Sequence, residues 1–260
     1  MQAAWRYRDF ILASVKREFT SRYLGTQLGF FWAIAQPLAL ILIYTLVFSE
    51  IMRPALPGHS SRMAYGIYLT SGIILWGLFG DLLGRSVGIF VHNATLLKKV
   101  SVPKLTLLAI ACLSALLNFS IALGLFVLFM LATGNWPGLA ILGLLPVVAI
   151  LLLFAVSLGL MLATVNVFYR DVEQSMGIVL QFWFWLTPIV YPSKALPDFM
   201  ATLLAWNPMW PVVRAMQDIF LGRAYPDWGS LAYPGVLAVC FLVMARVAFN
   251  RLSDELVDEL

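Results

Sequence analysis

Long apolar stretches that are nearly free of charge constrain the fold of this chain most. The stretch from Leu105 to Thr133, for example, contains no Asp, Glu, Lys or Arg. Hydrophobic residues make up 62% of the 260 residues and charged residues only 12%, whereas a soluble domain carries roughly 25% charged residues. A chain this apolar cannot cover a surface that faces water, so lipid must be its main solvent. We therefore expect an all-α integral membrane protein.

The length of the apolar stretches predicts how many helices cross the membrane. A spanning helix needs about 20 mostly apolar residues. This criterion predicts six transmembrane helices in a single transmembrane domain over residues 1–260, with spans one to five within residues 28–191 and span six over residues 231–249. The predicted spans are about Leu28–Glu50, Met63–Leu83, Leu105–Thr133, Leu139–Phe168, Gln174–Tyr191 and Leu231–Phe249.

The distribution of basic residues predicts the orientation. Loops on the cytoplasmic side of a membrane carry an excess of Lys and Arg. With both termini in the cytoplasm, 12 of the 17 Lys and Arg lie inside and 5 lie outside. We therefore expect cytoplasmic N- and C-termini, and residues 250–260 then form an acidic cytoplasmic tail.

Two segments on the cytoplasmic side are not expected to span. Residues 2–22 predict an amphipathic helix that lies in the membrane interface. Gly84 to Lys104 connects spans two and three, where Asn93 is expected to cap a short helix that Pro103 stops. This basic helix either anchors the loop or docks a soluble partner. The apolar side of the first segment consists of Trp5, Leu12, Val15, Phe19 and Tyr23, whereas most of its basic residues fall elsewhere.

The segment 192–229 on the outer side contains two apolar portions that are each too short to cross a bilayer. They cover about Leu196–Trp206 and Met209–Leu221, and Asn207-Pro208 separates them, since proline disfavours a helical residue before it. We expect a re-entrant or interfacial helical hairpin between spans five and six. Such backbone is tolerated at membrane depth only where protein or a water-filled cavity surrounds it, which indicates a pathway at the outer mouth.

The sequence lacks the motifs of an ion-coupled transporter or an enzyme. The middle of every predicted span has no ionisable residue, and Glu50 and Asp81 are expected at span ends. No phosphate-binding G-x-x-x-x-G-K-[ST] loop and no H-E-x-x-H zinc motif occurs. We therefore expect a transport subunit with no catalytic residue and no cofactor, with any ATP hydrolysis on a separate ATPase chain.

Metal, redox and nucleic-acid chemistry are also not expected. Cys112 and Cys240 lie in apolar runs without C-x-x-C spacing, and His59 and His92 lie in predicted loops. Lys and Arg sit at the ends of apolar stretches rather than on one face, as nucleic-acid binding needs. We therefore predict no metal site and no nucleic-acid partner.

Four consecutive aromatic residues, Phe182 to Trp185, lie in the fifth predicted span. Four successive rings point all around a helix, so some are expected to face an internal cavity. Aromatic walls suit a sugar polymer, whose C–H faces stack on rings while its hydroxyls stay hydrated. Many of the other aromatic residues are expected to pack between helices or to lie at the membrane interface.

Five short motifs, in order along the chain, resemble one family. The segment Arg22–Trp32, followed by Gln36-Pro37, resembles the start of the first span in ABC-2 permeases that export bacterial polysaccharides such as O-antigen, capsule and teichoic acid. Val102 departs from the pattern, because an aromatic residue is expected before Pro103. The four other matches are Asn93–Val100 with Pro103, Phe168–Asp171, Thr187–Tyr191 and Asn207-Pro208-Met209.

The resemblance implies the permease subunit of an ATP-driven exporter in the bacterial inner (cytoplasmic) membrane, moving a lipid-linked polysaccharide for lipopolysaccharide or capsule biosynthesis. It also implies a homodimer with two ATP-binding cassette ATPase subunits, which bind the ATP and Mg. An ABC-2 permease for another cargo, such as a drug or a lipid, is the alternative. A scaffold or a lipid-modifying enzyme is disfavoured, because Glu50, Asp81 and Asp171 are too scattered to form a catalytic pair.

The resemblance also assigns roles to individual residues. It makes the N-terminal helix the coupling helix that seats on the ATPase, with Lys16 and Arg17 as its basic contacts. Arg170 and Asp171, at the end of span four, form either an ion pair or a simple basic anchor. The remaining residues are the cytoplasmic gate loop, Asn93, Lys98, Lys99 and Pro103, and the substrate pathway, Trp32, Tyr44, Phe182 and Trp185, for which packing between helices is the alternative.

Overall fold

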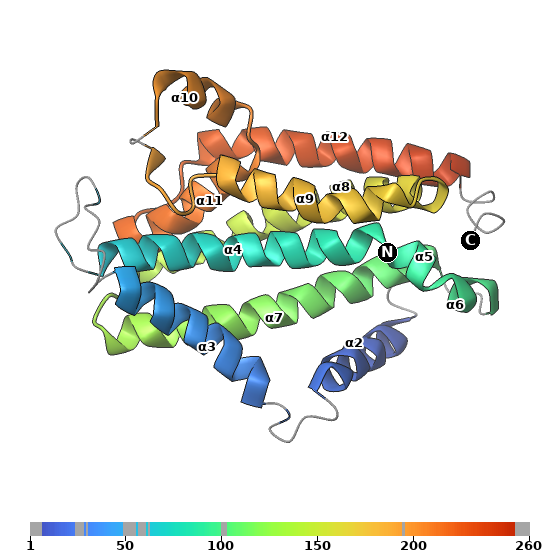
Figure 1. The fold of residues 1–260 in the computed structure, drawn as a ribbon, viewed down its shortest axis with the longest axis horizontal. Coiled ribbons are helices and arrows are strands. Elements are labelled where there is room, and N and C mark those ends of the chain that lie inside the picture. The colour runs from blue at the N-terminus through green and yellow to red at the C-terminus, as the bar shows by residue number, and fades with distance from the viewer. Residues whose placement is uncertain are drawn as a thin grey trace.

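The computed structural model of the chain describes residues 7–23, 29, 31–48, 56, 61, 63–99, 103–193 and 196–252. In these ranges the regular elements are helices, and no strand occurs among them. Helices lie side by side in one elongated bundle, which confirms the all-helical fold (Figure 1). Trp5, Glu50, His59, Val102 and the tail beyond Leu252 lie outside the described residues.

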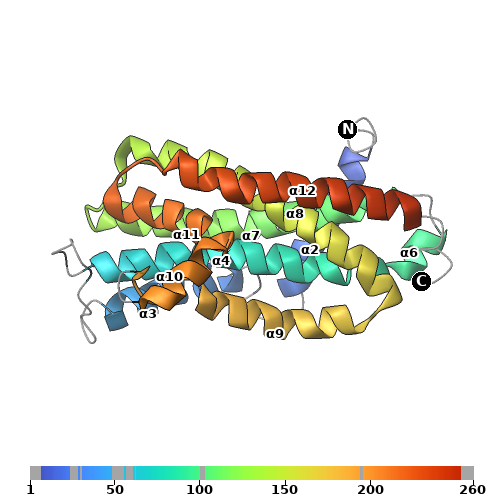
Figure 2. The ribbon, with the colours of Figure 1, turned by 90° about the horizontal axis from the view of Figure 1, so that it is seen from above.

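Four long apolar elements can cross a membrane by length and composition. They are α4 (Ala64–Val87), α7 (Lys104–Ala132), the 3-10 turn η2 (Gly138–Gly143) with α8 (Leu144–Phe168), and α12 (Trp228–Leu252). They run along the long axis of the bundle in both views (Figures 1 and 2). Spans two, three, four and six were predicted at these places.

The first and fifth predicted spans correspond to shorter helices. The helices α3 (Phe31–Leu46) and α9 (Asp171–Leu186) have 16 residues each, which is about 24 Å of helix against a hydrocarbon core of about 30 Å. The helix α9 does not reach Tyr191 as predicted. Pro188 moves Thr187 to an extended conformation, with ψ of 127°, and this ends the helix. The six-span topology therefore stays a prediction.

The helix α4 lies at the centre of the bundle and is the most buried of the long helices. It packs against α3, α7, α8, α9 and α11 (Met209–Gln217). It also extends beyond the predicted end at Leu83, so that Asp81 lies inside the helix and Arg85 in its last turn. The position of Asp81 relative to the membrane boundary stays a prediction.

Small residues allow α4 and α8 to approach closely. A Cβ atom added at Gly159 would lie 2.6 Å from the Cβ of Ser86, closer than real contacts allow. The helix α12 packs along α8 on the other side. Close contact through small residues is a common way to associate helices in lipid, where the hydrophobic effect between helices is absent.

The predicted interfacial helix corresponds to α2 (Arg8–Tyr23), which lies obliquely against α7 (Figure 1). Its inward side carries Ile11, Ser14 and Val15. Leu12, which the sequence pattern placed on the apolar side, is 61% exposed. Val15 of the predicted apolar side is buried, and the exposed Leu12 is available to lipid, so the orientation of this helix in the membrane interface stays a prediction.

Two groups of short helices close the ends of the bundle. The helices α5 (Ile89–His92) and α6 (Ala94–Lys99) lie at one end, which we call the α6 end. The helices α10 (Asp198–Ala205) and α11 (Met209–Gln217), followed by the π turn η4 (Asp218–Gly222), lie toward the other, the α11 end. The helix α11 is buried against the long helices, whereas α10 extends outward (Figure 1).

Candidate functional site

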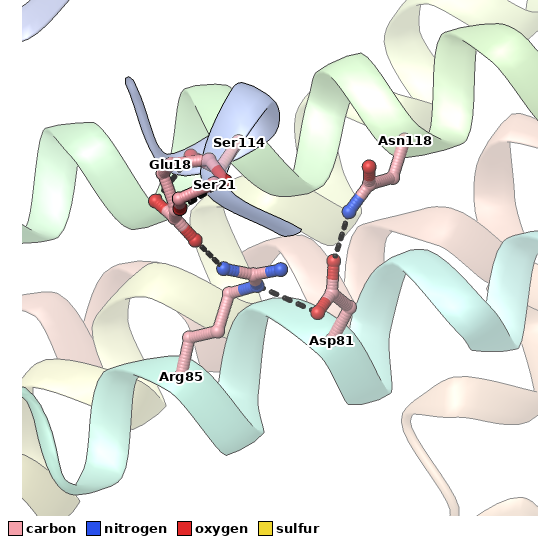
Figure 3. A network of polar contacts seen from close by, with 6 residues as sticks. All are labelled: Glu18, Ser21, Asp81, Arg85, Ser114 and Asn118. Carbon is pink, nitrogen blue, oxygen red and sulfur yellow. Dashed lines mark hydrogen bonds and ion pairs between the residues drawn. The ribbon is translucent and has the colours of Figure 1, made fainter. Parts of the chain in front are cut away.

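A network of charged and polar side chains joins α2, α4 and α7 (Figure 3). Arg85 of α4 forms ion pairs with Glu18 of α2 and with Asp81 one turn earlier, the latter at 2.6 Å. Ser114 of α7 donates to Glu18 at 2.8 Å, and Asn118 of α7 donates to Asp81 at 3.0 Å. Each carboxylate therefore places one oxygen on Arg85 and the other on a donor of α7.

The network is partly shielded from solvent. The side chain of Arg85 is 18% exposed, that of Asp81 31% and that of Glu18 37%. A cavity of only about 10 Å³ lies on one side of it, whereas Glu18 and Arg85 also line the larger cleft described below. A hydrogen bond to a charged group contributes about 1.5–3 kcal/mol, so these contacts fix α2 on the bundle.

This network was not predicted from the sequence. Arg85 falls in the predicted connection between spans two and three, and Glu18 has no predicted role. The i, i+4 spacing of Asp81 and Arg85 was the available signal, because residues at this spacing are neighbours on a helix. Asn118 lies midway along α7, so the network reaches the middle of a helix that is long and apolar enough to cross a membrane.

A second polar cluster closes the α6 end. The carboxylate of Glu173, in the first turn of α9, contacts the Nε2 atom of His92 at 3.1 Å. Asn166, fully buried in α8, accepts from the backbone N–H of Glu173 at 2.9 Å. A Cβ atom at Gly88 would meet the Glu173 carboxylate at 2.5 Å, so glycine leaves room for it. These contacts connect the loop after α4 to the α8–α9 turn.

The predicted gate residues lie in this loop, though not with the predicted local roles. The side chain of Asn93 donates to the carbonyl of Ile89 at 2.8 Å, so it closes α5 instead of capping the start of α6. Lys98 and Lys99 are exposed in the last turn of α6. Pro103 precedes the first residue of α7 and marks the start of that helix.

A cleft of about 550 Å³ separates α2 from the gate loop. Arg17 and Glu18 line it from α2, and Arg85, His92 and Asn93 line it from α4 and the gate loop. Lys16 is exposed next to Arg17. Arg170 and Asp171 are exposed at the α8–α9 turn and form no ion pair with each other.

At the α11 end, side chains satisfy the non-helical backbone that follows α9. The hydroxyl of Tyr68 in α4 lies 2.9 Å from the carbonyl oxygens of Pro188 and of Tyr191, which share its one proton. Tyr65 donates to the carbonyl of Val190. Gln217 of α11 donates to the carbonyl of Pro188 at 3.2 Å. Irregular backbone needs such partners at membrane depth, and α4 and α11 supply them here.

Asn207, at the break between α10 and α11, completes this arrangement. Its Oδ1 atom accepts from the indole N–H of Trp183 at 2.9 Å and from the backbone N–H of Met209 at 3.0 Å. Its Nδ2 atom donates to the carbonyl of Leu186 at 3.3 Å and to the hydroxyl of Thr187 at 3.0 Å. The predicted break at Asn207-Pro208 is therefore a junction that holds the end of α9.

The four aromatic residues of α9 divide into two pairs. Trp183 and Phe184 pack into the bundle, with ring centroids 6.3 and 5.7 Å from Trp76. Phe182 and Trp185 face away from it and are 67% and 56% exposed. Two of the four rings therefore belong to the core and two to the surface of the protomer.

A largely apolar groove of about 550 Å³ runs between α9 and α10. Phe182, Leu203 and Trp206 contribute to its lining. The other two predicted pathway residues lie on α3, where Trp32 is 47% exposed and Tyr44 is half-buried 6.3 Å from the Phe48 ring. The helices α3 and α9 both pack on α4, and a shared pathway for these residues stays a prediction.

Long apolar helices with polar contacts between them define a polytopic membrane protein. No group of His, Cys, Asp and Glu able to hold a metal ion occurs in the described part of the chain. The family of ABC-2 type transporters matches residues 10–221 of the sequence. The chain therefore belongs to the ABC-2 type transporter family.

Similarity to individual proteins extends over nearly the full length. The O-antigen export system permease protein RfbA of Myxococcus xanthus is 30% identical, over 98% of this chain and 97% of its own length. A protein of the same description from Klebsiella pneumoniae is 25% identical over 94% of this chain and 92% of its own. The polysialic acid transport protein KpsM of Escherichia coli is 25% identical over 92% and 91%.

Proposed function

We propose that this chain is the permease subunit of an ATP-driven ABC exporter that moves a lipid-linked polysaccharide, of the O-antigen or capsular type, across the bacterial inner membrane. The observation that carries the proposal is the similarity, over nearly the whole chain, to permeases of O-antigen export and to a polysialic acid transport protein. The long apolar helices support a function within the membrane.

The same proposal includes a homodimer with two ATPase subunits in the cytoplasm. The exposed rings of Trp32, Phe182 and Trp185 support an assembly in which further protein or substrate covers them. In that assembly α3 belongs to span one and α9 belongs to span five. The helices α10 and α11 form the outer re-entrant hairpin. An aromatic wall would contact sugar rings while hydroxyls stay hydrated, and weak contacts let a polymer move on.

The gate and coupling roles belong to the α6 end, which we assign to the cytoplasm together with both termini. Lys16 and Arg17 are exposed on α2 and are available to an ATPase. The gate loop with Asn93, Lys98, Lys99 and Pro103 lies across a cleft from α2. A lipid-linked glycan enters at this end and leaves past α10 and α11.

Deletion and co-purification test the proposal. Deleting the gene is expected to abolish the surface polysaccharide and to leave its precursor inside the cell. The tagged protein, expressed with its neighbouring genes, is expected to capture an ATPase. Normal surface polysaccharide in the deletion strain would favour another cargo, such as a drug or a lipid. If no ATPase is ever captured, the exporter assignment fails.

A further inference from the structure

The network of Figure 3 connects three helices in a closed triangle. Glu18 joins α2 to α4 through Arg85 and joins α2 to α7 through Ser114. Asp81 joins α4 to α7 through Asn118 at 3.0 Å. Because every pair of helices has its own contact, a tilt of one helix against the other two must break at least one charged hydrogen bond.

The contact between α2 and α4 depends on side chains. The helix α2 packs mainly on α7, through Ile11 and Val15. Its reach to α4 is the Glu18–Arg85 ion pair, supported by the Arg85–Asp81 pair at 2.6 Å. On its other side α2 borders the cleft of about 550 Å³ that separates it from the gate loop. Polar contacts therefore hold α2 on the side that faces α4 and α7, whereas its other side borders an open cleft.

We propose that Glu18, Arg85 and Asp81 form a joint that makes α4 and α7 follow α2 when an ATPase displaces it. This inference rests on the proposed function, in which α2 is the seat of the ATPase. Glu18 is then a positioning residue for transport: it contacts neither substrate nor nucleotide, and it transmits movement to Arg85. The central position of α4 carries that movement to α3, α8, α9 and α11, against which it packs.

Glu18→Gln tests the joint in the complex with its ATPase, because glutamine keeps the size and a hydrogen bond to Ser114 but removes the charge facing Arg85. The variant is expected to assemble with the ATPase and to hydrolyse ATP within about twofold of wild type. Polysaccharide export is expected to fall by about tenfold, within the roughly 5- to 150-fold range typical of lost coupling between sites. Asp9→Asn is the matched control, since Asp9 lies on the same helix with a side chain that is 90% exposed.

A cysteine pair gives a second test, in which export per ATP hydrolysed is measured before and after cross-linking. If Glu18 had only a structural role, cross-linking would not restore this ratio. Glu18→Cys with Ser114→Cys, in a background of Cys112→Ala and Cys240→Ala, replaces one side of the triangle by a link that a short bis-methanethiosulfonate can form, with one disulfide to each cysteine and methanesulfinate as the leaving group. Before cross-linking, export per ATP hydrolysed is expected to be low. After cross-linking it is expected to recover, because α2 and α7 again move together.

Each outcome decides the question. Export by Glu18→Gln equal to that of Asp9→Asn overturns the joint, and so does cross-linking that blocks export instead of restoring it. If Glu18→Gln does not accumulate, Ser114→Ala and the cysteine pair carry the same comparison. A wild-type complex that captures no ATPase and exports no polysaccharide contradicts the proposed function itself, whereas an active wild type with an unaffected Glu18 variant contradicts the joint alone.

Discussion

Two neighbouring tryptophans in α9 have opposite environments. Trp183 lies edge-on to the rings of Phe79 and Phe154, at centroid distances of 5.2 and 6.3 Å, and its N–H is bound by Asn207. Trp185 is 56% exposed. The helical step of 3.6 residues per turn separates their directions by about 200°, so the same residue type serves packing at one position and an outer surface two residues later.

Alanine at these two positions is expected to separate stability from transport. Trp183→Ala should cost about 3–5 kcal/mol of stability, because it leaves a cavity and removes one of the two hydrogen bonds that Asn207 Oδ1 accepts. Trp185→Ala should change stability by less than about 0.5 kcal/mol and should reduce export, while Trp185→Phe should retain most of it. The thermal midpoint of the purified complex measures stability, and the amount of surface polysaccharide measures export. Equal destabilisation by the two alanines would assign Trp185 to packing.

At the scale of elements, the contact between α4 and α8 depends on the absence of a side chain. Gly159 faces Ser86, whose Oγ atom would lie 2.9 Å from an added Cβ. The fully buried hydroxyl of Ser86 also donates to the carbonyl of Leu82 at 2.7 Å. Neither residue can give way easily, because backbone and core packing hold both of them.

Gly159→Ala is therefore expected to destabilise the protein by about 1–3 kcal/mol, the usual cost of overpacking. Gly124→Ala is the control, since nothing lies within 4 Å of an added Cβ there. Alanine favours a helix over glycine by about 1 kcal/mol, so this control should be neutral or slightly stabilising. Thermal denaturation of the two purified variants gives the comparison. A stable Gly159→Ala protein would mean that α4 and α8 separate without cost.

The long elements could be predicted from the sequence, because twenty or more apolar residues in a row allow few alternatives. The ends of α4 and α9 could not. Asp81 and Arg85 stay inside α4 because Glu18 and Asn118, from other helices, satisfy their charges. The helix α9 stops at Leu186 because distant side chains bind the backbone that follows. Such partners come from parts of the chain far away in sequence, and no local pattern contains them.

At the scale of the whole molecule, the bundle has two chemically distinct ends. Basic side chains and the Glu18–Arg85–Asp81 network lie toward the α6 end, whereas tyrosines and the amides of Asn207 and Gln217 bind backbone at the α11 end (Figure 1). This asymmetry agrees with the excess of Lys and Arg expected on the cytoplasmic side of a membrane.

Single cysteines at exposed positions of the two ends test this orientation. In a variant with Cys112→Ala and Cys240→Ala, a cysteine at Thr95 is expected to react with a membrane-impermeant maleimide only after the inner membrane is opened. A cysteine at Ala224 should react in spheroplasts with intact inner membranes. Thr95 lies in α6 and Ala224 just beyond η4, and both are exposed. Labelling in the reverse order would invert the proposed topology.

Backbone carbonyls at the C-terminal end of α9 and just after it accept hydrogen bonds from the protein itself, and this affects any hydroxyl-rich chain that passes the α11 end. The oxygens of Leu186, Pro188, Val190 and Tyr191 already accept hydrogen bonds from side chains of the protein itself. A sugar hydroxyl that comes near this bend therefore competes with internal donors for these oxygens. The bend can therefore line an opening without binding the sugar chain tightly.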